Sequence, residues 1–320
     1  MFEMGGYLPL ELSEGPLPWS HLDPSDRFEV NTGRTAIWCA LKSLHVRKLF
    51  LPAYYCPNVV EMLRKTGVEL CFYSIDRDFL PVDVHDEPDS ALLLVNYYGL
   101  LTEKLEPFLR RFDKVILDQA HALFAPPVLQ EGVMNVYSFR KFVGVSDGGC
   151  LIGKGIERPE LELDQSHPRA MHLFKCYETG TNGAYAESKA SENSLEAFRL
   201  LSPLTRRILQ GVDYGRIENK RRENAKCLHE RLADVQRLRF SLNDSAPYLY
   251  PLLLDRDIHR ALVERRIYVP YLWSQLLDEA WNGTTEQEFA RNIVALPVDQ
   301  RYGEAEMCRL AEIIEEILQA

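Results

Sequence analysis

The segment at residues 137–149 carries side chains that could do covalent chemistry. It reads Tyr-Ser-Phe-Arg-Lys-Phe-Val-Gly-Val-Ser-Asp-Gly-Gly and overlaps the apolar run at 133–139. The apolar run predicts a strand, so Ser138 and Lys141 should project from a strand end into a loop. A hydroxyl and an amine in that place suit ligand binding, because open α/β sheets hold ligands at the carboxyl ends of their strands.

A second group of reactive side chains lies upstream. Residues 115–122 read Val-Ile-Leu-Asp-Gln-Ala-His-Ala, a buried-strand pattern that ends in Asp118, with His121 three residues later. An acid, an imidazole, a hydroxyl and an amine at neighbouring strand ends make one candidate site. The alternative for Asp118 and Lys141 is a structural ion pair.

The beginning of a helix offers a possible anion site. The sequence Asn-Thr-Gly-Arg-Thr at 31–35 precedes the apolar-periodic residues 36–44, which indicates a capped helix N-terminus. The free N–H groups and the dipole of such a helix could hold a phosphate, and Arg34 could add positive charge. An ordinary capped helix is the alternative interpretation.

Short apolar runs alternate with helical patterns in the first half of the chain. We expect strands at 49–52, 68–75, 91–95 and 115–117, and helices at 57–65 and 103–112. This alternation predicts crossover connections and a largely parallel sheet with helices on its faces. Functional groups should then gather at the carboxyl ends of the strands.

The second half of the chain has weaker patterns. Residues 157–193 read as a long, polar and irregular stretch, which would lie over the site or at a subunit contact. Residues 194–235 predict a helical region with arginines on its polar positions, which we interpret as a solvated face. These arginines are Arg206, Arg207, Arg216, Arg221 and Arg222.

The last part of the chain predicts a small α+β domain. We expect strands at 248–254 and 267–270, and helices at 257–265 and 304–318. The chain therefore divides into an irregular lead-in (1–30), a large α/β domain (31–235) and a small domain (236–320).

Composition disfavours several classes of protein. With 320 residues, 46% of them hydrophobic, the chain can bury a sizeable core. Its net charge of -10 and scattered basic residues argue against a nucleic-acid partner. We find neither a secretory leader pattern nor an apolar run long enough to cross a bilayer, so we expect a cytoplasmic protein without membrane partners.

Cysteine and histidine spacing does not indicate a metal site. Seven cysteines are spread without a C-x-x-C pair, which indicates reduced core thiols. A catalytic thiol at Cys56, in a loop-like segment, is the alternative. The histidines in 157–193 have no acid or thiol partner at metal-ligand spacing, so we predict no metal.

The candidate groups together match the needs of pyridoxal phosphate (PLP). That cofactor needs an anion cradle, an aromatic face, a carboxylate at its pyridine nitrogen and a lysine for a Schiff base. The chain resembles the sugar aminotransferases of the DegT/DnrJ/EryC1/StrS family, PLP enzymes of fold type I, the aspartate aminotransferase fold. The matching pieces occur in order at 31–37, 51–55, 73–76, 95–99, 117–122, 138–141 and 147–149. Looser matches continue to the end of the chain.

The resemblance implies a role for each candidate catalytic residue. Lys141 would form the Schiff base and then carry a proton between cofactor carbon and substrate carbon. Asp118 would pair with the pyridine nitrogen, and His121 would sit beside the ring hydroxyl or the ring face. A free lysine, with a pKa of ~10.4, is a poor nucleophile at neutral pH, so we expect the pocket and the cofactor to lower it.

The resemblance also implies which residues hold the cofactor. Tyr54 or Tyr55 would stack on its ring. The phosphate would be held by four residues from two segments: Gly33, Arg34, Thr35 and Ser138.

Two features depart from the family pattern. The gap between Ser138 and Lys141 is two residues shorter than usual, although Arg140 cannot replace the lysine because its guanidinium stays protonated. The asparagine that a neighbouring subunit lends to the phosphate has only Asn182 as a candidate here.

The resemblance implies a homodimeric PLP-dependent aminotransferase. It would move an amino group from glutamate to a keto-sugar, nucleotide-linked, in polysaccharide or amino-sugar biosynthesis. In the family's dehydratases a histidine replaces the lysine. The presence of Lys141 therefore favours transamination over dehydration. The alternatives are a non-catalytic relative that binds a ligand or partner, and a PLP-dependent lyase or dehydratase. Lys175, Tyr177 and Tyr185 could contact substrate, or could be surface or dimer contacts.

Overall fold

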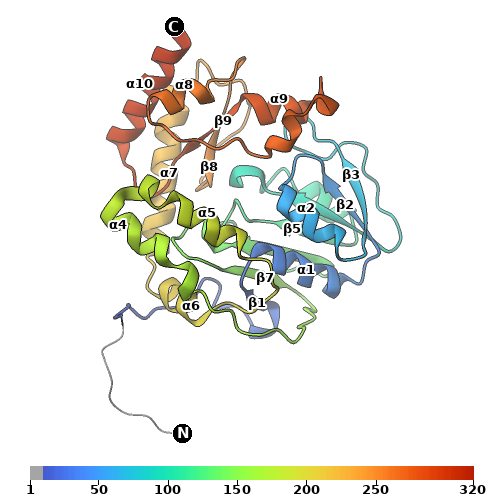
Figure 1. Cartoon of the computed structure of the whole chain (residues 1–320). Coiled ribbons are helices and arrows are strands. Elements are labelled where there is room, and N and C mark those ends of the chain that lie inside the picture. The colour runs from blue at the N-terminus through green and yellow to red at the C-terminus, as the bar shows by residue number, and fades with distance from the viewer. Residues whose placement is uncertain (1–9) are drawn as a thin grey trace.

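A mostly parallel sheet forms the centre of the molecule. The structure is a computed structural model that describes residues 10–320. Within them, a seven-stranded sheet has the order β1-β7-β6-β5-β4-β2-β3 (Figure 1). Its strands are β1 (Arg27–Val30), β2 (Lys48–Pro52), β3 (Glu69–Tyr73), β4 (Ser90–Val95), β5 (Val115–Asp118), β6 (Val133–Ser138) and β7 (Gly149–Gly153). β7 runs antiparallel to both β1 and β6, and the other neighbouring pairs are parallel.

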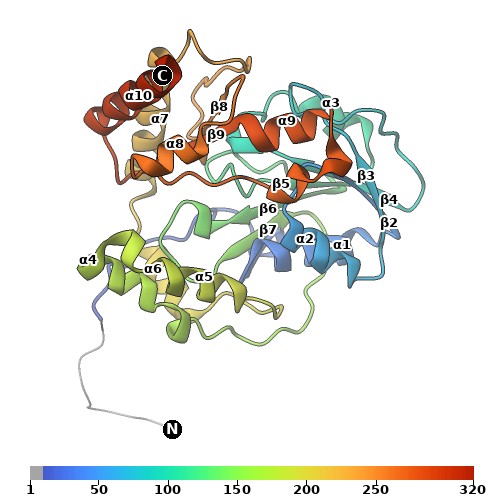
Figure 2. The ribbon, with the colours of Figure 1, turned by 45° about the horizontal axis from the view of Figure 1, so that its top comes forward.

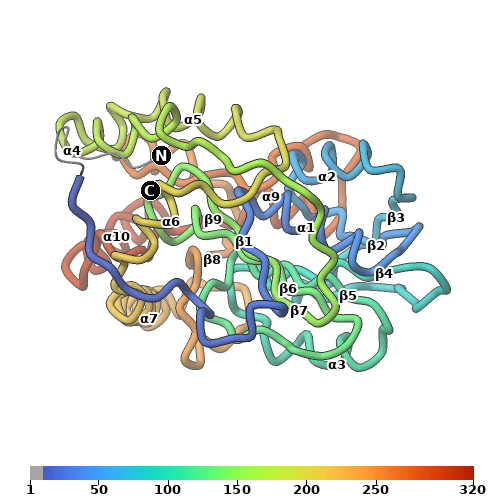
Figure 3. The backbone as a smooth tube through the Cα atoms, turned by 90° about the horizontal axis from the view of Figure 1, so that it is seen from below, coloured from blue at the N-terminus to red at the C-terminus, as the bar shows by residue number. Residues whose placement is uncertain are grey.

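Helices cover both faces of this sheet. In Figure 3, α1 (Gly33–Leu44) and α2 (Pro57–Arg64) lie on one face and α3 (Glu106–Arg111) lies on the other. The side chain of Thr32 caps α1 by accepting from the Thr35 N–H, and a proline at the first position begins α2. These crossover helices account for the parallel strand order predicted from the sequence.

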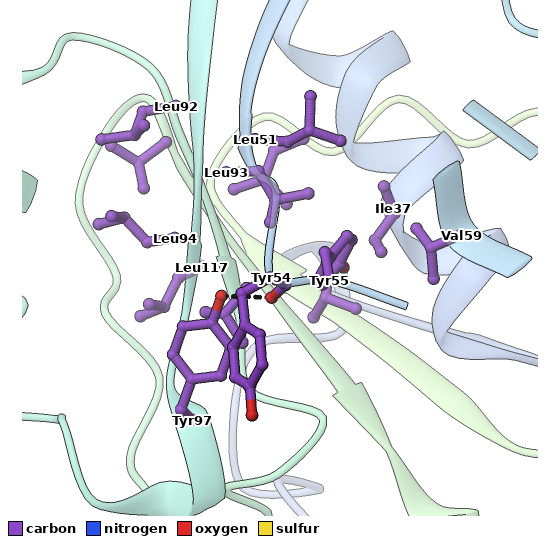
Figure 4. Packing of buried hydrophobic residues seen from close by; sticks show 14 of the residues in the cluster. Ile37, Leu51, Tyr54, Tyr55, Val59, Leu92, Leu93, Leu94, Tyr97 and Leu117 are labelled. Atoms are coloured by element: carbon purple, nitrogen blue, oxygen red, sulfur yellow. Dashed lines mark hydrogen bonds between the residues drawn. The ribbon is translucent and has the colours of Figure 1, made fainter. Parts of the chain in front are cut away.

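The central strands are apolar on both faces because helices pack on both. All six residues of β4 are buried. In Figure 4, Leu92 and Leu94 point to one side of the sheet, and Leu93 points to the other, where Ile37 and Val59 lie beyond it. A continuous apolar run is therefore what this position requires.

The C-terminal part adds a two-stranded antiparallel sheet. It consists of β8 (Leu249–Leu253) and β9 (Ile293–Pro297), with α7 (Tyr214–Arg231), α8 (His259–Glu264), α9 (Thr285–Asn292) and α10 (Glu304–Gln319) around it (Figure 2). Successive side chains of β9 alternate: Ile293 joins the main core, and Val294 joins a second core shared with α7 and α10. The small sheet thus links two hydrophobic cores.

Several expectations about elements were wrong. The lead-in is not irregular up to residue 30, because β1 pairs with β7; four residues of alternating polarity were too short a signal. No strand forms at 267–270, and β9 instead pairs with β8. Pro270 would have removed a donor from such a strand.

The stretch at 157–193 is also not irregular throughout. Its second half forms α4 (Met171–Gly183) and α5 (Tyr185–Asn193), followed by α6 (Pro203–Gln210). The boundary at residue 235 cuts the second core, because Ala225, Leu228 and Leu232 pack there with the small sheet. Within residues 10–320, no helix is long and apolar enough to cross a membrane.

Candidate active site

The strand register brings the candidate residues to one edge of the sheet. Asp118, the last residue of β5, is paired with Val95, the last residue of β4, on one side and with Val136 on the other, so β4 and β5 end level with each other and β6 ends two residues later. Ser138 closes β6, and β2 ends just before Tyr54. Asp118 and Ser138 therefore lie at the carboxyl edge of the sheet, where the sequence prediction placed the candidate groups.

The antiparallel strand β7 brings the start of α1 to the same edge. Gly149 pairs with both Ser138 and Val30. A Cβ atom on Gly149 would lie 2.6 Å from the carbonyl carbon of Thr32, so only glycine permits this approach. As a result, a Cβ built on Gly33 lies 3.7 Å from the Cβ of Ser138. The two residues expected at a phosphate are neighbours.

The side chains of Thr35 and Arg34 have protein partners. The Thr35 hydroxyl donates to Asn31 Oδ1 at 2.6 Å and lies 2.9 Å from the Thr32 hydroxyl. Arg34 Nη2 donates to the carbonyl of Leu195 at 2.5 Å. Thr35 thus contributes to the helix cap, and its part in phosphate binding stays a prediction, as does that of Arg34.

Asp118 is a buried carboxyl with two donors. The Tyr55 hydroxyl donates to Oδ2 at 2.5 Å, and the Ala120 N–H donates to Oδ1 at 2.8 Å. Burial raises the pKa of Asp118, whereas both hydrogen bonds and the charge of Lys141 oppose that rise. The carboxyl therefore lacks a full counter-charge, and a cation placed against it would favour its ionised form.

Lys141 and His121 both lie next to the ring of Tyr248. The Lys141 Nζ atom lies 4.9 Å from the centroid of the Tyr248 ring, and the His121 ring lies 4.8 Å from the same centroid. The Tyr98 N–H donates to His121 Nδ1 at 3.4 Å. Burial and the charge of Lys141 lower the pKa of His121, so the imidazole is neutral.

The expectation that the pocket and the cofactor together lower the pKa of Lys141 stays a prediction, and the protein groups alone act in the other direction. Tyr248 raises the pKa of Lys141 above its ordinary value and outweighs burial, which lowers it. The cause is electrostatic, because the ionisable Tyr248 phenol close to the ammonium favours the charged form of the lysine.

Tyr54 and Tyr55 occupy different surroundings. Tyr54 is fully buried, with rings around it from Phe79, Tyr97, Trp273 and Phe289. The Tyr97 hydroxyl donates to the carbonyl of Tyr54 at 2.6 Å (Figure 4). Tyr55 is the residue of the pair that contacts Asp118. Stacking of either ring on a cofactor stays a prediction, and the contact favours Tyr55.

Arg221 is a buried arginine beside the candidate site that the sequence interpretation missed. It is 2% exposed, not solvated as we expected, because it lies on the face of α7 that packs against the lysine loop, the turn Phe139–Lys141. Its guanidinium donates to the carbonyls of Pro247 (3.1 Å), Tyr248 (2.8 Å) and Lys141 (3.4 Å). It also lies 4.5 Å from the Phe142 ring centroid. Arg221 therefore holds together the two segments that meet at Lys141 and Tyr248.

Replacing Arg221 with glutamine should destabilise the protein by about 2–3 kcal/mol, because buried carbonyls lose their donors. Chemical denaturation of the Arg221→Gln protein measures the change. Arg216→Gln on the exposed side of the same helix is the control and should shift stability by less than about 0.5 kcal/mol. Equal stability of the two variants would contradict a holding role for Arg221.

The remaining candidates lie on α4 and α5. Asn182 and Tyr177 are exposed on α4, and Tyr185 is exposed at the start of α5. Lys175 forms an ion pair with Glu187, which joins the two helices. Contact of these residues with substrate or with a second subunit stays a prediction.

Comparisons with known proteins agree with this architecture. No family model matches the chain, and no curated protein matches it. Solved structures do match. The sugar aminotransferase Spr1654 from Streptococcus pneumoniae, in its PLP form, has a TM-score of 0.63 at 14% identity, over 91% of this chain and 87% of its own.

Two further solved structures give the same result. DesI, solved with its TDP-sugar product, has a TM-score of 0.59 at 15% identity, over 90% of this chain and 79% of its own. A DegT/DnrJ/EryC1/StrS aminotransferase from Brucella abortus has a TM-score of 0.58 at 16% identity, over 91% and 85% of the two chains. The expected fold class is confirmed: the chain has the α/β fold of the PLP-dependent sugar aminotransferases.

Proposed function

We propose that this protein is a PLP-dependent aminotransferase. The observation that carries the proposal is the meeting of Lys141, Asp118 and His121 at the strand edge where Gly33 and Ser138 lie together. Several solved structures with this fold are named as sugar aminotransferases, and others contain PMP or a ketimine intermediate, which supports it.

The residues present fit the cofactor. Asp118 is a buried acid with no full counter-charge, and it would hold the pyridine nitrogen protonated. The first turn of α1 and the Ser138 hydroxyl would hold the phosphate. His121 and Tyr55 border the same space, and Lys141 supplies the amine. PLP, once bound, supplies an electron sink that stabilises negative charge at the substrate carbon.

The chain's own groups would perform the proton transfers. Lys141 would hold the cofactor through its amine and, once free of it, would accept and return a proton at the substrate carbon. Tyr248 keeps the released amine close, because its ring favours the charged ammonium at that position. Asp118 accepts from Tyr55 and from the Ala120 N–H, and it would hold a protonated ring nitrogen as its counter-charge.

We infer that the amino donor is glutamate and that the acceptor is a nucleotide-linked keto-sugar. The names of the neighbouring structures, sugar aminotransferases and a TDP-sugar complex, support this class of substrate. The same class of substrate supports a role for this protein in polysaccharide or amino-sugar biosynthesis.

We also propose that the protein is a cytoplasmic homodimer. Exposed apolar side chains on α4 and α5 support a subunit contact there: Met171, Phe174, Tyr177 and Tyr185. Measurement of molar mass in solution tests the dimer.

The test of the function is cofactor uptake followed by a half-reaction. Purified protein mixed with PLP should gain a visible absorbance, and adding glutamate should convert it while releasing 2-oxoglutarate. A nucleotide-linked keto-sugar should then restore the absorbance and take up the nitrogen, which a ¹⁵N label follows. A colourless protein, or one whose donor keeps its nitrogen, would contradict the proposal.

A further inference from the structure

Tyr55 reaches the buried carboxyl of Asp118 through its hydroxyl. The residue lies between β2 and α2, is 3% exposed, and donates to Oδ2 of Asp118 at 2.5 Å. Its backbone is held from two sides. The Tyr55 N–H donates to the carbonyl of Ala53 at 2.9 Å, and the Gln275 side chain donates to the carbonyl of Tyr55 at 2.8 Å. The large domain and the C-terminal part of the chain therefore fix this phenol against the carboxyl together.

The neighbouring phenols have other surroundings. The Tyr97 hydroxyl donates to the carbonyl of Tyr54. Within residues 10–320, the hydroxyls of Tyr54 and Tyr98 are buried without a hydrogen-bond partner. Of these phenols at the ends of β2 and β4, it is that of Tyr55 which bonds the carboxyl. Burial of aromatic residues at this edge does not by itself bring a hydroxyl to Asp118.

The groups that face Asp118 come from three strand ends. Tyr55 follows β2, Tyr97 follows β4, and Lys141 follows β6. Burial raises the pKa of Asp118, and among the groups that oppose this rise the Tyr55 hydrogen bond has the largest effect, followed by the Ala120 N–H and by Lys141. Burial and the charge of Asp118 raise the pKa of Tyr55 well above its ordinary value, so the phenol stays a donor.

Asp118 keeps room for a further donor beside Tyr55. Each carboxylate oxygen can accept two hydrogen bonds, and here Oδ2 accepts from Tyr55 and Oδ1 accepts from Ala120. A protonated ring nitrogen could therefore bond the carboxylate while Tyr55 stays in place. The proton between these two groups lies on the more basic one. A phenol that donates to the carboxylate makes it less basic, which favours the proton on nitrogen.

We propose that Tyr55 is a positioning residue that holds the Asp118 carboxylate so that the shared proton stays on the ring nitrogen of the cofactor. The proposal rests on the proposed function for the identity of the cofactor. It gives Tyr55 a role through its hydroxyl, which differs from the ring stacking predicted from the sequence.

Unfolding of the cofactor-free protein at two pH values tests the bond between Tyr55 and Asp118. Tyr55→Phe removes the hydroxyl and keeps the ring. Tyr73→Phe is the matched control, because the buried Tyr73 hydroxyl donates to an uncharged acceptor, the carbonyl of Leu93, at 2.7 Å. We expect Tyr55→Phe to lower the folding equilibrium constant about 5-fold at pH 4 and about 50-fold at pH 8, since hydrogen bonds to charged groups are the stronger ones. The control should lower it about 5-fold at both.

The direction of this pH dependence follows from the pKa of Asp118. Loss of the Tyr55 donor raises the folded-state pKa further above the ordinary value of 3.8. Stability that depends on a raised pKa is lost as pH rises through it, so the variant loses stability over a longer range of pH than wild type does. The gap between the two proteins should therefore widen from pH 4 to pH 8. The same gap at both pH values would overturn the proposal.

The protonation of the bound cofactor is the second measurement. In PLP labelled with ¹⁵N in the ring, the NMR shift of that nitrogen distinguishes a protonated ring from a neutral one. Wild type and Tyr73→Phe should both hold a protonated ring. In Tyr55→Phe the ratio of protonated to neutral ring should fall about tenfold, the change that corresponds to one pKa unit. A Tyr55→Phe protein that binds PLP with the wild-type shift would contradict the proposal.

A measurement on wild type covers the case in which Tyr55→Phe does not fold. The infrared difference spectrum between cofactor-free wild type and Asp118→Asn contains the bands of this one carboxyl. A carboxylate band at pH 7 is expected, whereas the band of a protonated carboxyl at that pH would overturn the proposal. Wild type that takes up no PLP would defeat the proposed function, and the unfolding experiment would still decide whether Tyr55 holds the carboxylate.

Discussion

Replacement of Lys141 by alanine should abolish covalent attachment of PLP and slow amino transfer by about 10⁴-fold or more, since both the nucleophile and the proton carrier are lost. The expected result is a protein without the visible absorbance. Borohydride treatment should leave its mass unchanged, whereas wild type should gain the mass of one reduced cofactor on Lys141.

Lys226→Ala is the control for this experiment. Lys226 lies on the exposed side of α7, 72% exposed, so its loss should alter neither absorbance nor mass gain. Circular dichroism should show that both variants are folded. Retention of the absorbance by Lys141→Ala would mean that another amine binds the cofactor, and the assignment of Lys141 would then be wrong.

The central sheet could be predicted because each strand carries its own signal. Runs such as Leu92–Leu93–Leu94 are apolar at every position, which fits a strand covered on both faces. Once the strands are placed, the parallel register fixes where they end, and Asp118 and Ser138 follow at the same edge. Local pattern and sheet geometry together were therefore enough for these two residues.

The residues that complete the site could not be predicted because their contacts are distant in sequence. Tyr248 is more than one hundred residues from Lys141, and nothing in its own segment marks it as a neighbour of an amine. Arg221 reads as a solvated arginine, and only the packing of α7 under the lysine loop buries it. β9 pairs with β8 across an intervening stretch of about forty residues, which local periodicity does not report.

The short gap between Ser138 and Lys141 has a local explanation. Residues Phe139–Lys141 form a single 3₁₀ turn directly after β6, and the Phe142 N–H closes it on the carbonyl of Phe139. The Gln300 side chain donates to the carbonyl of Phe142 at 2.8 Å, and Arg221 donates to that of Lys141. A compact turn held by the C-terminal part thus brings the lysine to Tyr248 and His121 without the two extra residues.

Replacement of Asp118 by asparagine should reduce activity and raise the stability of the cofactor-free protein. Activity should fall about 10²- to 10³-fold, because asparagine cannot supply the negative charge that keeps the pyridine nitrogen protonated. The half-reaction with glutamate measures this loss. Asp78→Asn, at an exposed ion pair with Lys104, is the control and should leave the rate unchanged.

The gain in stability should depend on pH. Burial raises the pKa of Asp118 in the folded protein above its ordinary value of 3.8. At a pH between the ordinary pKa of the unfolded chain and the raised pKa of the folded protein, the folded protein therefore holds a proton that the unfolded chain has released. The stability of wild type therefore falls as pH rises from about 4 through the raised pKa, while that of Asp118→Asn does not. At pH 8 the variant should unfold with a free energy about 1 kcal/mol higher than wild type, a difference that shrinks at pH 4.

Addition of PLP should reverse the order of the two proteins. A protonated ring beside Asp118 supplies the counter-charge that the buried carboxyl lacks, so PLP should stabilise wild type more than the variant. Urea unfolding at pH 8, with and without PLP, measures both differences. A variant that is less stable than wild type in both states would show that Asp118 serves the fold, through Tyr55 and Ala120, and not the cofactor.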